Sequence, residues 1–360
     1  MNYEINGGAQ VTVPVLTVAA TPQGRRDPDF ADLARRVRDA GLFHRAAWRT
    51  AVRLVLISTL YGAGWAALFV VGNSWYQLLV AAYLAVVFAQ VGFLGHDIGH
   101  RQIFRSRRWN RTAGLVYGNL AIGIGYDYWV DKHNRHHAHP NEVGADPDVG
   151  PGVIAWTADQ VDGKSGLGRA IARYQAALFF PLTCLEALSL HVASARSLRG
   201  KRGRRVVIEA VLLTTHAAAY LAAVFVVLSP LRGLAFIGLQ QGIFGLYLGC
   251  AFAPNHKGME MVSPDQTLSF AQRQVITSRN VKGGRALDVA LGGLNYQIEH
   301  HLFPSIPMAN LRRCQPIVRA YCLSHELDYS ETTLLSSYMI ALRYLRSTGR
   351  PPTLNSGPRS

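Results

Sequence analysis

The chain has 360 residues, of which 49% are hydrophobic and only 16% are charged, and its formal net charge is +15. Soluble domains average about 25% charged residues, so this composition argues against an ordinary soluble protein. A basic balance is typical of nucleic-acid binders, but the long apolar segments described below favour a membrane protein that binds no nucleic acid.

The first segments of the chain are polar or amphipathic. Residues 1–29 are rich in Gly, Pro and small polar residues, and we expect a flexible N-terminal tail. They show no pattern of a cleavable signal peptide. An amphipathic stretch, residues 30–48, leads into the first apolar segment.

Four apolar segments each have about the 20 residues that a helix needs to cross a hydrocarbon core. Short polar joints leave them little choice but to pair as two hairpins. The sequence therefore predicts an all-α membrane protein with four transmembrane helices and both termini on one side. The predicted spans are residues 51–72, 76–95, 206–229 and 233–253.

Basic residues indicate which side of the membrane the termini occupy. Arginines follow the second predicted span at 101–111, and arginines and a lysine precede the third at 196–205. The positive-inside rule places these segments and both termini in the cytoplasm, so residues 96–205 and 254–335 would form a cytoplasmic helical cap. The excess of Arg over Lys suggests a bacterial source and hence the plasma membrane.

Two further apolar stretches, residues 112–130 and 174–195, are predicted to lie in the membrane interface. The first contains several Gly and Asn residues, and the second contains Pro181 and Glu186. Crossing at the first stretch would also separate the histidine clusters described next. The four cysteines show no metal-binding spacing and are predicted to be free thiols: Cys184, Cys250, Cys314 and Cys322.

Three histidine clusters carry the functional signal. Residues three or four apart share one face of a helix, so each cluster can present its imidazoles to one point, and the predicted topology puts all three on the cytoplasmic side. One tetrahedral zinc site would need only three or four histidines, so the clusters suggest two metal ions. Imidazole suits Zn, Cu, Fe and Ni. The cluster residues are His96, His100, His133, His136, His137, His300 and His301.

The other histidines favour less specific interpretations. His44, His191, His216 and His325 are isolated, and we expect them to be hydrogen-bonded packing residues. A metal transporter with histidine gates is a non-enzymatic alternative, but it would need ionisable residues along a path within the spans. The spans offer few such residues.

The three clusters, with the hairpins between them, resemble the eight-histidine motif of the integral membrane fatty acid desaturases. The Asn in His133-Asn-Arg-His-His137 and the Gln in Gln297-Ile-Glu-His-His301 resemble the acyl-lipid and front-end branch. The resemblance covers roughly residues 40–335. It places a desaturase domain at 30–335, followed by a C-terminal tail at 336–360.

The resemblance implies that the seven cluster histidines ligate two iron ions, with O2 as co-substrate. His256, just beyond the fourth span, is expected to be the eighth ligand. The implied reaction introduces a cis double bond into a fatty acyl chain carried by CoA or by a membrane lipid. The histidine-bearing and interfacial segments would bound an apolar tunnel for that chain. A hydroxylase or ketolase with a similar site is the alternative, and it would add oxygen to its product.

Polar neighbours of the histidines are candidates for supporting roles. Gln297 could ligate iron, hold a water or hydrogen-bond a ligand, and we favour a role in the site other than direct ligation. Asp146 and Asp148 fit either a turn around Pro147 or an orienting role. Further residues that could orient imidazole nitrogens are Asp97, Asn134, Asn255, Asn295 and Glu299.

Electrons for the implied reaction have no recognisable entry point in this sequence. Many front-end desaturases are fused to a cytochrome b5 domain with a His-Pro-Gly-Gly motif, which this sequence lacks. It also lacks a GxGxxG fingerprint and a ferredoxin-like cysteine set. We therefore expect a separate donor, such as a ferredoxin, cytochrome b5 or a flavin reductase.

Overall fold

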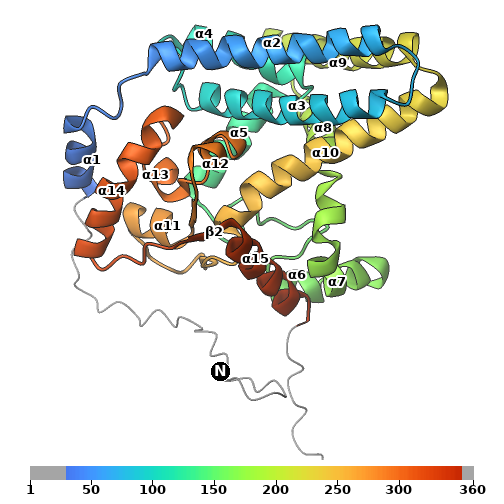
Figure 1. Ribbon diagram of the computed structural model, residues 1–360. Helices are drawn as coiled ribbons and strands as arrows, with labels where there is room; N and C mark the ends of the chain where they lie inside the picture. The colour runs from blue at the N-terminus through green and yellow to red at the C-terminus, as the bar shows by residue number, and fades with distance from the viewer. Residues whose placement is uncertain (1–29, 351–360) are drawn as a thin grey trace, which may run out of the picture.

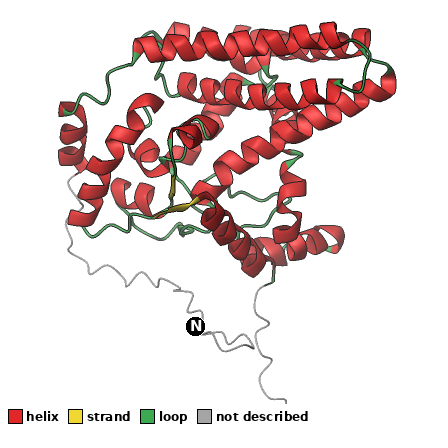
Figure 2. Cartoon of the chain, viewed as in Figure 1, coloured by secondary structure: helices red, strands yellow, loops and turns green. Residues whose placement is uncertain are grey.

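The computed structural model describes residues 30–350. The predicted N-terminal tail, residues 1–29, lies outside the described residues, as do residues 351–360 of the predicted C-terminal tail. Figure 2 shows that the described part of the chain is mostly helical, with two short strands.

Four long apolar helices form two consecutive hairpins, and each is long and apolar enough to cross a membrane. In Figure 1, α2, α3 and α9 run along the top, and α10 descends obliquely from them. The four-span, all-α fold predicted from the sequence is confirmed. The helices are α2 (Ala47–Val71), α3 (Gln77–Gly99), α9 (Arg204–Val227) and α10 (Pro230–His256).

The outer faces of these helices are apolar and exposed. Val70 and Val226 are 85% and 80% exposed, which suits a surface covered by lipid chains. The inner faces pack around aromatic side chains, where Phe88 and Phe244 lie edge to face with ring centroids 5.6 Å apart. The apolar core of the spans therefore lies between the two hairpins.

Two of the spans extend beyond their predicted ends. Helix α3 continues to Gly99 and α10 continues to His256 without interruption. Each residue adds 1.5 Å along a helix, so these last turns carry His96 and His256 past the apolar segments while remaining part of the same rods.

The two stretches predicted to lie in the interface are broken helices. The first contains α4 (Arg107–Gly114), the π-helix η1 (Leu115–Ala121) and α5 (Tyr126–Ala138). Gly123, with φ of 69°, makes the turn between η1 and α5, a conformation that favours glycine. The second stretch contains α7 (Gly166–Thr183) and α8 (Glu186–Ser197), which meet at 81°.

The remaining elements form a cap beside the spans (Figure 1). Its core contains Leu302, Val318 and Tyr321, and Phe30 stacks on Phe303 with ring centroids 5.3 Å apart. Strands β1 and β2 pair in parallel. The cap elements are α1 (Phe30–Asp39), α6 (Ala158–Asp162), α11 (Phe270–Ile276), β1 (Asn280–Lys282), α12 (Arg285–Ala290), α13 (Gln297–Leu302), α14 (Met308–Ser324) and β2 (Glu331–Thr333).

The segment predicted to be a C-terminal tail from residue 336 contains a packed helix, α15 (Leu334–Gly349). Its Leu345 is fully buried, and Tyr338 donates a hydrogen bond to the carbonyl of Cys250 in α10 at 2.7 Å. The tail prediction is therefore wrong for residues 336–349. The helix is amphipathic rather than uniformly apolar, and its partners are distant in the sequence.

Gly245 allows α10 to approach the corner between α7 and α8. A Cβ at this position would lie 2.8 Å from the Thr183 carbonyl oxygen and 2.9 Å from the Ala187 nitrogen. We expect Gly245→Ala to reduce stability by about 1–3 kcal/mol through overpacking, measured as a lower thermal midpoint of the detergent-purified protein. Gly238→Ala in the same helix meets no atom within 4 Å and is the matched control. Equal midpoints for the two variants would contradict this account.

Candidate metal centre

The three histidine clusters converge, although they come from different parts of the fold. The end of α3 supplies His96 and His100, and α5 supplies the three histidines of the second cluster. The end of α10 and the short helix α13 supply the others. The converging residues are His96, His100, His133, His136, His137, His256, His300 and His301.

The imidazoles divide into two groups, in each of which the possible ligand atoms all lie within 4.8 Å of one another. Between the groups lies His137, whose Nε2 is 3.1 Å from Nε2 of His133 and whose ring stacks on His301 with centroids 4.3 Å apart. The first group is His96, His100, His133 and His300, and the second is His136, His256 and His301.

The spacing of the nitrogens fits ligands of a shared metal ion. Nε2 atoms are 2.9 Å apart for His133 and His100, 3.2 Å for His96 and His300 and 3.3 Å for His136 and His256. Two ligands that are each about 2.1 Å from a metal lie about 3.0 Å apart at a right angle and about 3.4 Å apart at a tetrahedral angle.

In the second group, hydrogen bonds donated by Nδ1 leave Nε2 as the nitrogen available to a metal ion. Nδ1 of His256 donates to the carbonyl of Thr277 at 2.9 Å, and Nδ1 of His301 donates to Oε1 of Gln274 at 2.9 Å. His136 donates from Nδ1 to Asp146 at 3.0 Å. In the neutral imidazoles Nε2 is then the acceptor, and such outer partners are typical of metal-binding histidines.

Without a cation, the lone pairs of His136 and His301 would lack a donor from the described residues, whereas that of His256 can accept from the Gln297 amide. Nε2 of His136 and Nε2 of His256 face each other as two acceptors, and the buried Nε2 of His301 has no hydrogen-bond partner among residues 30–350. A buried acceptor without a partner is unfavourable. The donor set therefore fits a metal ion at the second group, and four imidazoles of suitable spacing fit one at the first.

Burial keeps these imidazoles in the form that binds metals. It lowers the pKa of His133, His137, His300 and His301 well below the usual range, and repulsion from neighbouring histidines lowers these pKa values further. The rings are consequently neutral at physiological pH, with a lone pair available for coordination.

Gln297 lies beside the second group. Its Nε2 is 2.9 Å from Nε2 of His256, and its Oε1 accepts a hydrogen bond from Asn255 at 3.3 Å. The amide thus contacts the nitrogen through which His256 would bind a metal. A role for Gln297 in the site, without direct ligation, stays a prediction.

The other polar candidates have mixed positions. Asp97 forms an ion pair with Arg53 and lies 3.4 Å from Nδ1 of His96. Asn295 donates to Asp288 at 2.9 Å, and Glu299 accepts hydrogen bonds from Asn280 and from a tyrosine. Within residues 30–350, neither the Asn295 nor the Glu299 side chain hydrogen-bonds to a histidine. Burial raises the pKa of Glu299 to about 7.

The orienting role predicted for Asn134 is wrong. Its side chain is exposed and has no hydrogen bond to a histidine among the described residues. The helical period explains the error, because His133, His136 and His137 share one face of α5 and residue 134 points away from it. By contrast, Asp146 has the orienting contact that the sequence left open against a simple turn.

Two supporting residues escaped the sequence analysis. Gln274 holds His301 and also donates to the backbone carbonyl of His137 at 3.0 Å, while Thr277 acts through its own carbonyl. Neither belongs to a histidine motif. Only Gln274 could have been suspected from the sequence, because it is a polar residue on the buried face of α11, where it is fully buried.

Three of the four isolated histidines and the cysteines agree with expectation, whereas His44 is exposed and its side chain forms no hydrogen bond within residues 30–350, so the packing role predicted for it is wrong. His191 bonds to the carbonyl of Gly123 at 2.8 Å, His216 bonds to that of Leu120 at 2.9 Å, and His325 contacts Tyr321. All four cysteines are free thiols, as predicted.

Fold and site together define a helical integral membrane protein with a histidine-rich candidate metal centre next to its spans. Residues 73–333 match the family model described as fatty acid desaturase. The chain belongs to the fatty acid desaturase family and is therefore an oxidoreductase.

Curated relatives with similar sequences are eukaryotic desaturases. The chain is 30% identical to a Δ8-fatty-acid desaturase of Euglena gracilis over 88% of this chain and 78% of the relative. It is 29% identical to the Δ6-fatty-acid desaturase fat-3 of Caenorhabditis elegans over 94% of this chain and 78% of the relative. An acyl-lipid (9-3)-desaturase of Physcomitrium patens is 32% identical over 75% of this chain, which spans about half (53%) of that relative.

The contact between Gln274 and His301 leads to a test of metal affinity. We expect Gln274→Met to weaken metal binding by about 10- to 100-fold, because loss of the acceptor frees the orientation of the imidazole. Titration of the metal-free protein with Fe²⁺ against a competing chelator measures this.

The control removes another buried glutamine, Gln175, which bonds to the backbone of Ala155 and Leu345 away from the histidines. Gln175→Met should lower thermal stability and leave the metal affinity unchanged. Wild-type affinity in Gln274→Met would show that the contact does not support the site.

Proposed function

We propose that this desaturase introduces a cis double bond into a fatty acyl chain, using O2 and two iron ions held by its eight converging histidines. The observation that supports this most is the presence of two groups of imidazole nitrogens whose separations match those between ligands of one metal ion. His96, His100, His133 and His300 would hold one ion. His136, His256 and His301 would hold the other, with His137 between them.

Bound iron would supply the oxidising power to remove hydrogens from an unactivated methylene pair, which no acidic or basic side chain can do. The protein's own groups hold and orient. Thr277, Gln274 and Asp146 fix the imidazole rings, and the deep burial of the site excludes bulk water.

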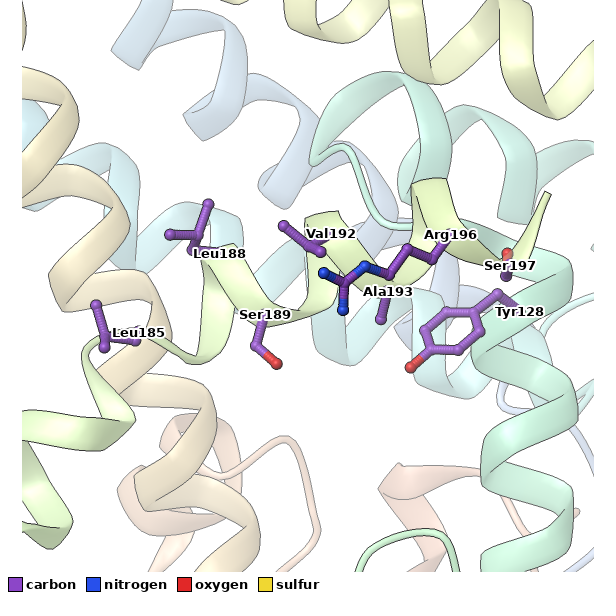
Figure 3. Close-up of a pocket in the computed structure, with 8 residues that line it drawn as sticks. All are labelled: Tyr128, Leu185, Leu188, Ser189, Val192, Ala193, Arg196 and Ser197. Atoms are coloured by element: carbon purple, nitrogen blue, oxygen red, sulfur yellow. The ribbon is translucent and has the colours of Figure 1, made fainter. Parts of the chain in front are cut away.

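A groove between α5 and α8 offers an approach for the acyl substrate (Figure 3). Its volume of about 610 Å³ is within the range of small-molecule sites, roughly 300–1,000 Å³. Leu185, Leu188 and Val192 supply an apolar wall, while Tyr128 and Arg196 supply polar groups. We propose that the acyl chain lies along this wall with an anionic carrier, CoA or a lipid headgroup, near Arg196.

The position of the groove supports this use. Tyr128 belongs to α5, the helix that carries three of the histidines, and α8 lies in the apolar stretch expected at the membrane interface. The groove thus borders both segments that the sequence analysis expected to enclose the substrate.

We further propose that electrons come from a separate donor such as a ferredoxin, cytochrome b5 or a flavin reductase. The net charge of +15 supports an acidic partner.

The arginines that flank the spans support cytoplasmic termini and a cytoplasmic metal site. A cysteine introduced at Ser74, in a hairpin tip, tests this orientation. It should react with a membrane-impermeant thiol reagent added outside the cell. The relatives are eukaryotic, and they do not support the bacterial source suggested by composition.

His300→Ala tests the metal centre. The first group would lose one of its four imidazoles, and we expect the desaturated product to fall below detection while membrane insertion is unchanged. Mass spectrometry of the acyl products, in a host with a compatible donor, measures the new double bond. An added oxygen in the wild-type product would instead indicate a hydroxylase or ketolase.

The control for this variant is His44→Ala, because His44 is exposed and lies in neither histidine group. It should retain full product yield and iron content. Retained activity in His300→Ala would overturn the assignment of this ligand.

Val192→Trp tests the groove. The larger side chain would occlude the apolar wall, and losing roughly 1.5 kcal/mol of apolar contact raises KM for the acyl substrate about tenfold. Iron content should not change, because Val192 is 38% exposed and lies on α8, which carries none of the eight converging histidines. Val226→Trp, on the exposed face of α9, is the matched control and should behave like wild type. Equal kinetics in the two variants would exclude the groove as the substrate approach.

A further inference from the structure

The end of α10 contains a proline, and this leaves backbone carbonyls without their usual donors. Pro254 has no N–H, so the Cys250 carbonyl cannot receive a normal helical hydrogen bond. The helix ends two residues later at His256, and the carbonyls of a last turn also lack intrahelical donors. A candidate metal ligand therefore lies at a weakened helix end.

Donors from outside α10 satisfy these carbonyls. Tyr338 donates to the Cys250 carbonyl at 2.7 Å, and the Ser337 hydroxyl donates to the Pro254 carbonyl. Arg279 also donates to the Pro254 carbonyl, from Nε at 3.2 Å and from Nη2 at 2.6 Å. Two of these three donors belong to α15, the helix that the sequence analysis placed in a tail.

Arg279 is an unusual cation because its side chain is 1% exposed and no carboxylate among residues 30–350 pairs with it. Its guanidinium instead bonds to the Pro254 carbonyl, to the Lys257 carbonyl at 3.1 Å and to Ser337 Oγ at 2.9 Å. Burial lowers the pKa of Arg279 to about 10, so it stays charged at neutral pH. The negative end of the α10 dipole accounts for this placement.

The same short segment also holds the imidazole ring of His256. Thr277 accepts the Nδ1 hydrogen of His256 through its carbonyl at 2.9 Å, and the backbone N–H of Arg279 donates to the Asn255 carbonyl at 2.8 Å. Residues 277–279 thus contact both the backbone of the helix end and the ring. Rotation or fraying of the last turn would move Nε2 of His256 away from His136, which is 3.3 Å away.

We propose that Arg279, supported by Ser337 and Tyr338 of α15, is a positioning residue that aims His256 at the second metal. This inference rests on the proposed two-metal site. The planar guanidinium donates in two directions at once, whereas an ammonium is a compact point charge. Lysine at this position would keep the positive charge but would lose the planar set of donors that reaches two acceptors at once.

The experiment compares Arg279→Lys and Tyr338→Phe with wild type, using the full-length protein without bound metal. Titration with Co²⁺, followed by its visible absorption, reports the number and affinity of metal sites without turnover. We expect wild type to bind two ions. In both variants one ion should bind about 10- to 100-fold more weakly, while the other keeps wild-type affinity.

Tyr344→Phe is the matched control, because this tyrosine lies on the same helix and donates to the Trp156 carbonyl, away from the end of α10. It should bind both ions with wild-type affinity, and the thermal midpoints of the metal-free proteins show how much each change affects folding. Two wild-type affinities in Tyr338→Phe and Arg279→Lys would overturn the proposal. Equal weakening of both ions, matched by Tyr344→Phe, would also overturn it by showing a general loss of stability.

The outcomes separate this inference from the proposed function. If wild type binds fewer than two ions, the two-metal site itself is wrong. If wild type binds two and the variants do as well, the metal centre stands and only the role of Arg279 is rejected. Tyr338→Phe removes a single hydroxyl, so the test remains decisive even if Arg279→Lys does not fold.

Discussion

The repulsion between facing imidazole lone pairs is the constraint on which this structure depends. His136, His256 and His301 each give their Nδ1 hydrogen to a protein acceptor, which turns unprotonated nitrogens toward one another in a buried volume. Among residues 30–350, the Gln297 amide can donate to Nε2 of His256, but the other two nitrogens face no donor. The arrangement is therefore unfavourable for neutral groups alone and becomes favourable when a cation lies between them. The fold holds these rings in place by bringing together His136 and His256, which are 120 residues apart in the sequence.

The membrane helices and the cap contribute differently to that arrangement. Helices α3 and α10 are continuous from the apolar layer into the site, so a histidine on each has a fixed depth relative to the membrane. Helices α5 and α13 each supply one histidine to both groups and so complete them. Helix α5 also contributes Tyr128 to the groove that α8 lines. The same helix therefore connects the proposed position of the acyl chain with three of the candidate metal ligands. A site of this kind can act on a chosen carbon pair only if such distances are fixed.

The sequence was informative where one physical rule dominates. Apolar length determines the spans, and helical spacing groups the histidines, so both could be predicted. His256 was expected only through the resemblance to the desaturase family, which places an eighth histidine after the fourth span. Prediction failed where the partner is remote or where only the backbone acts. Thr277 contributes a carbonyl, which leaves no trace in residue type. Asn134 was misassigned because proximity in sequence to two ligands says nothing about which face of α5 a side chain occupies.

Helix α15 shows why the missing part is not incidental. The carbonyls of an exposed helix end can bond to water, so such an end can fray without disturbing its neighbours. The end of α10 lacks that independence. Pro254 leaves the Cys250 carbonyl without its helical donor, the Pro254 carbonyl lies in the last turn, and among residues 30–350 both accept from residues 279, 337 and 338. Docking of the cap on the spans and the geometry at His256 therefore depend on the same hydrogen bonds. A change that loosens α15 would therefore affect the candidate metal centre, although within residues 30–350 no side chain of that helix hydrogen-bonds to a histidine of the two groups.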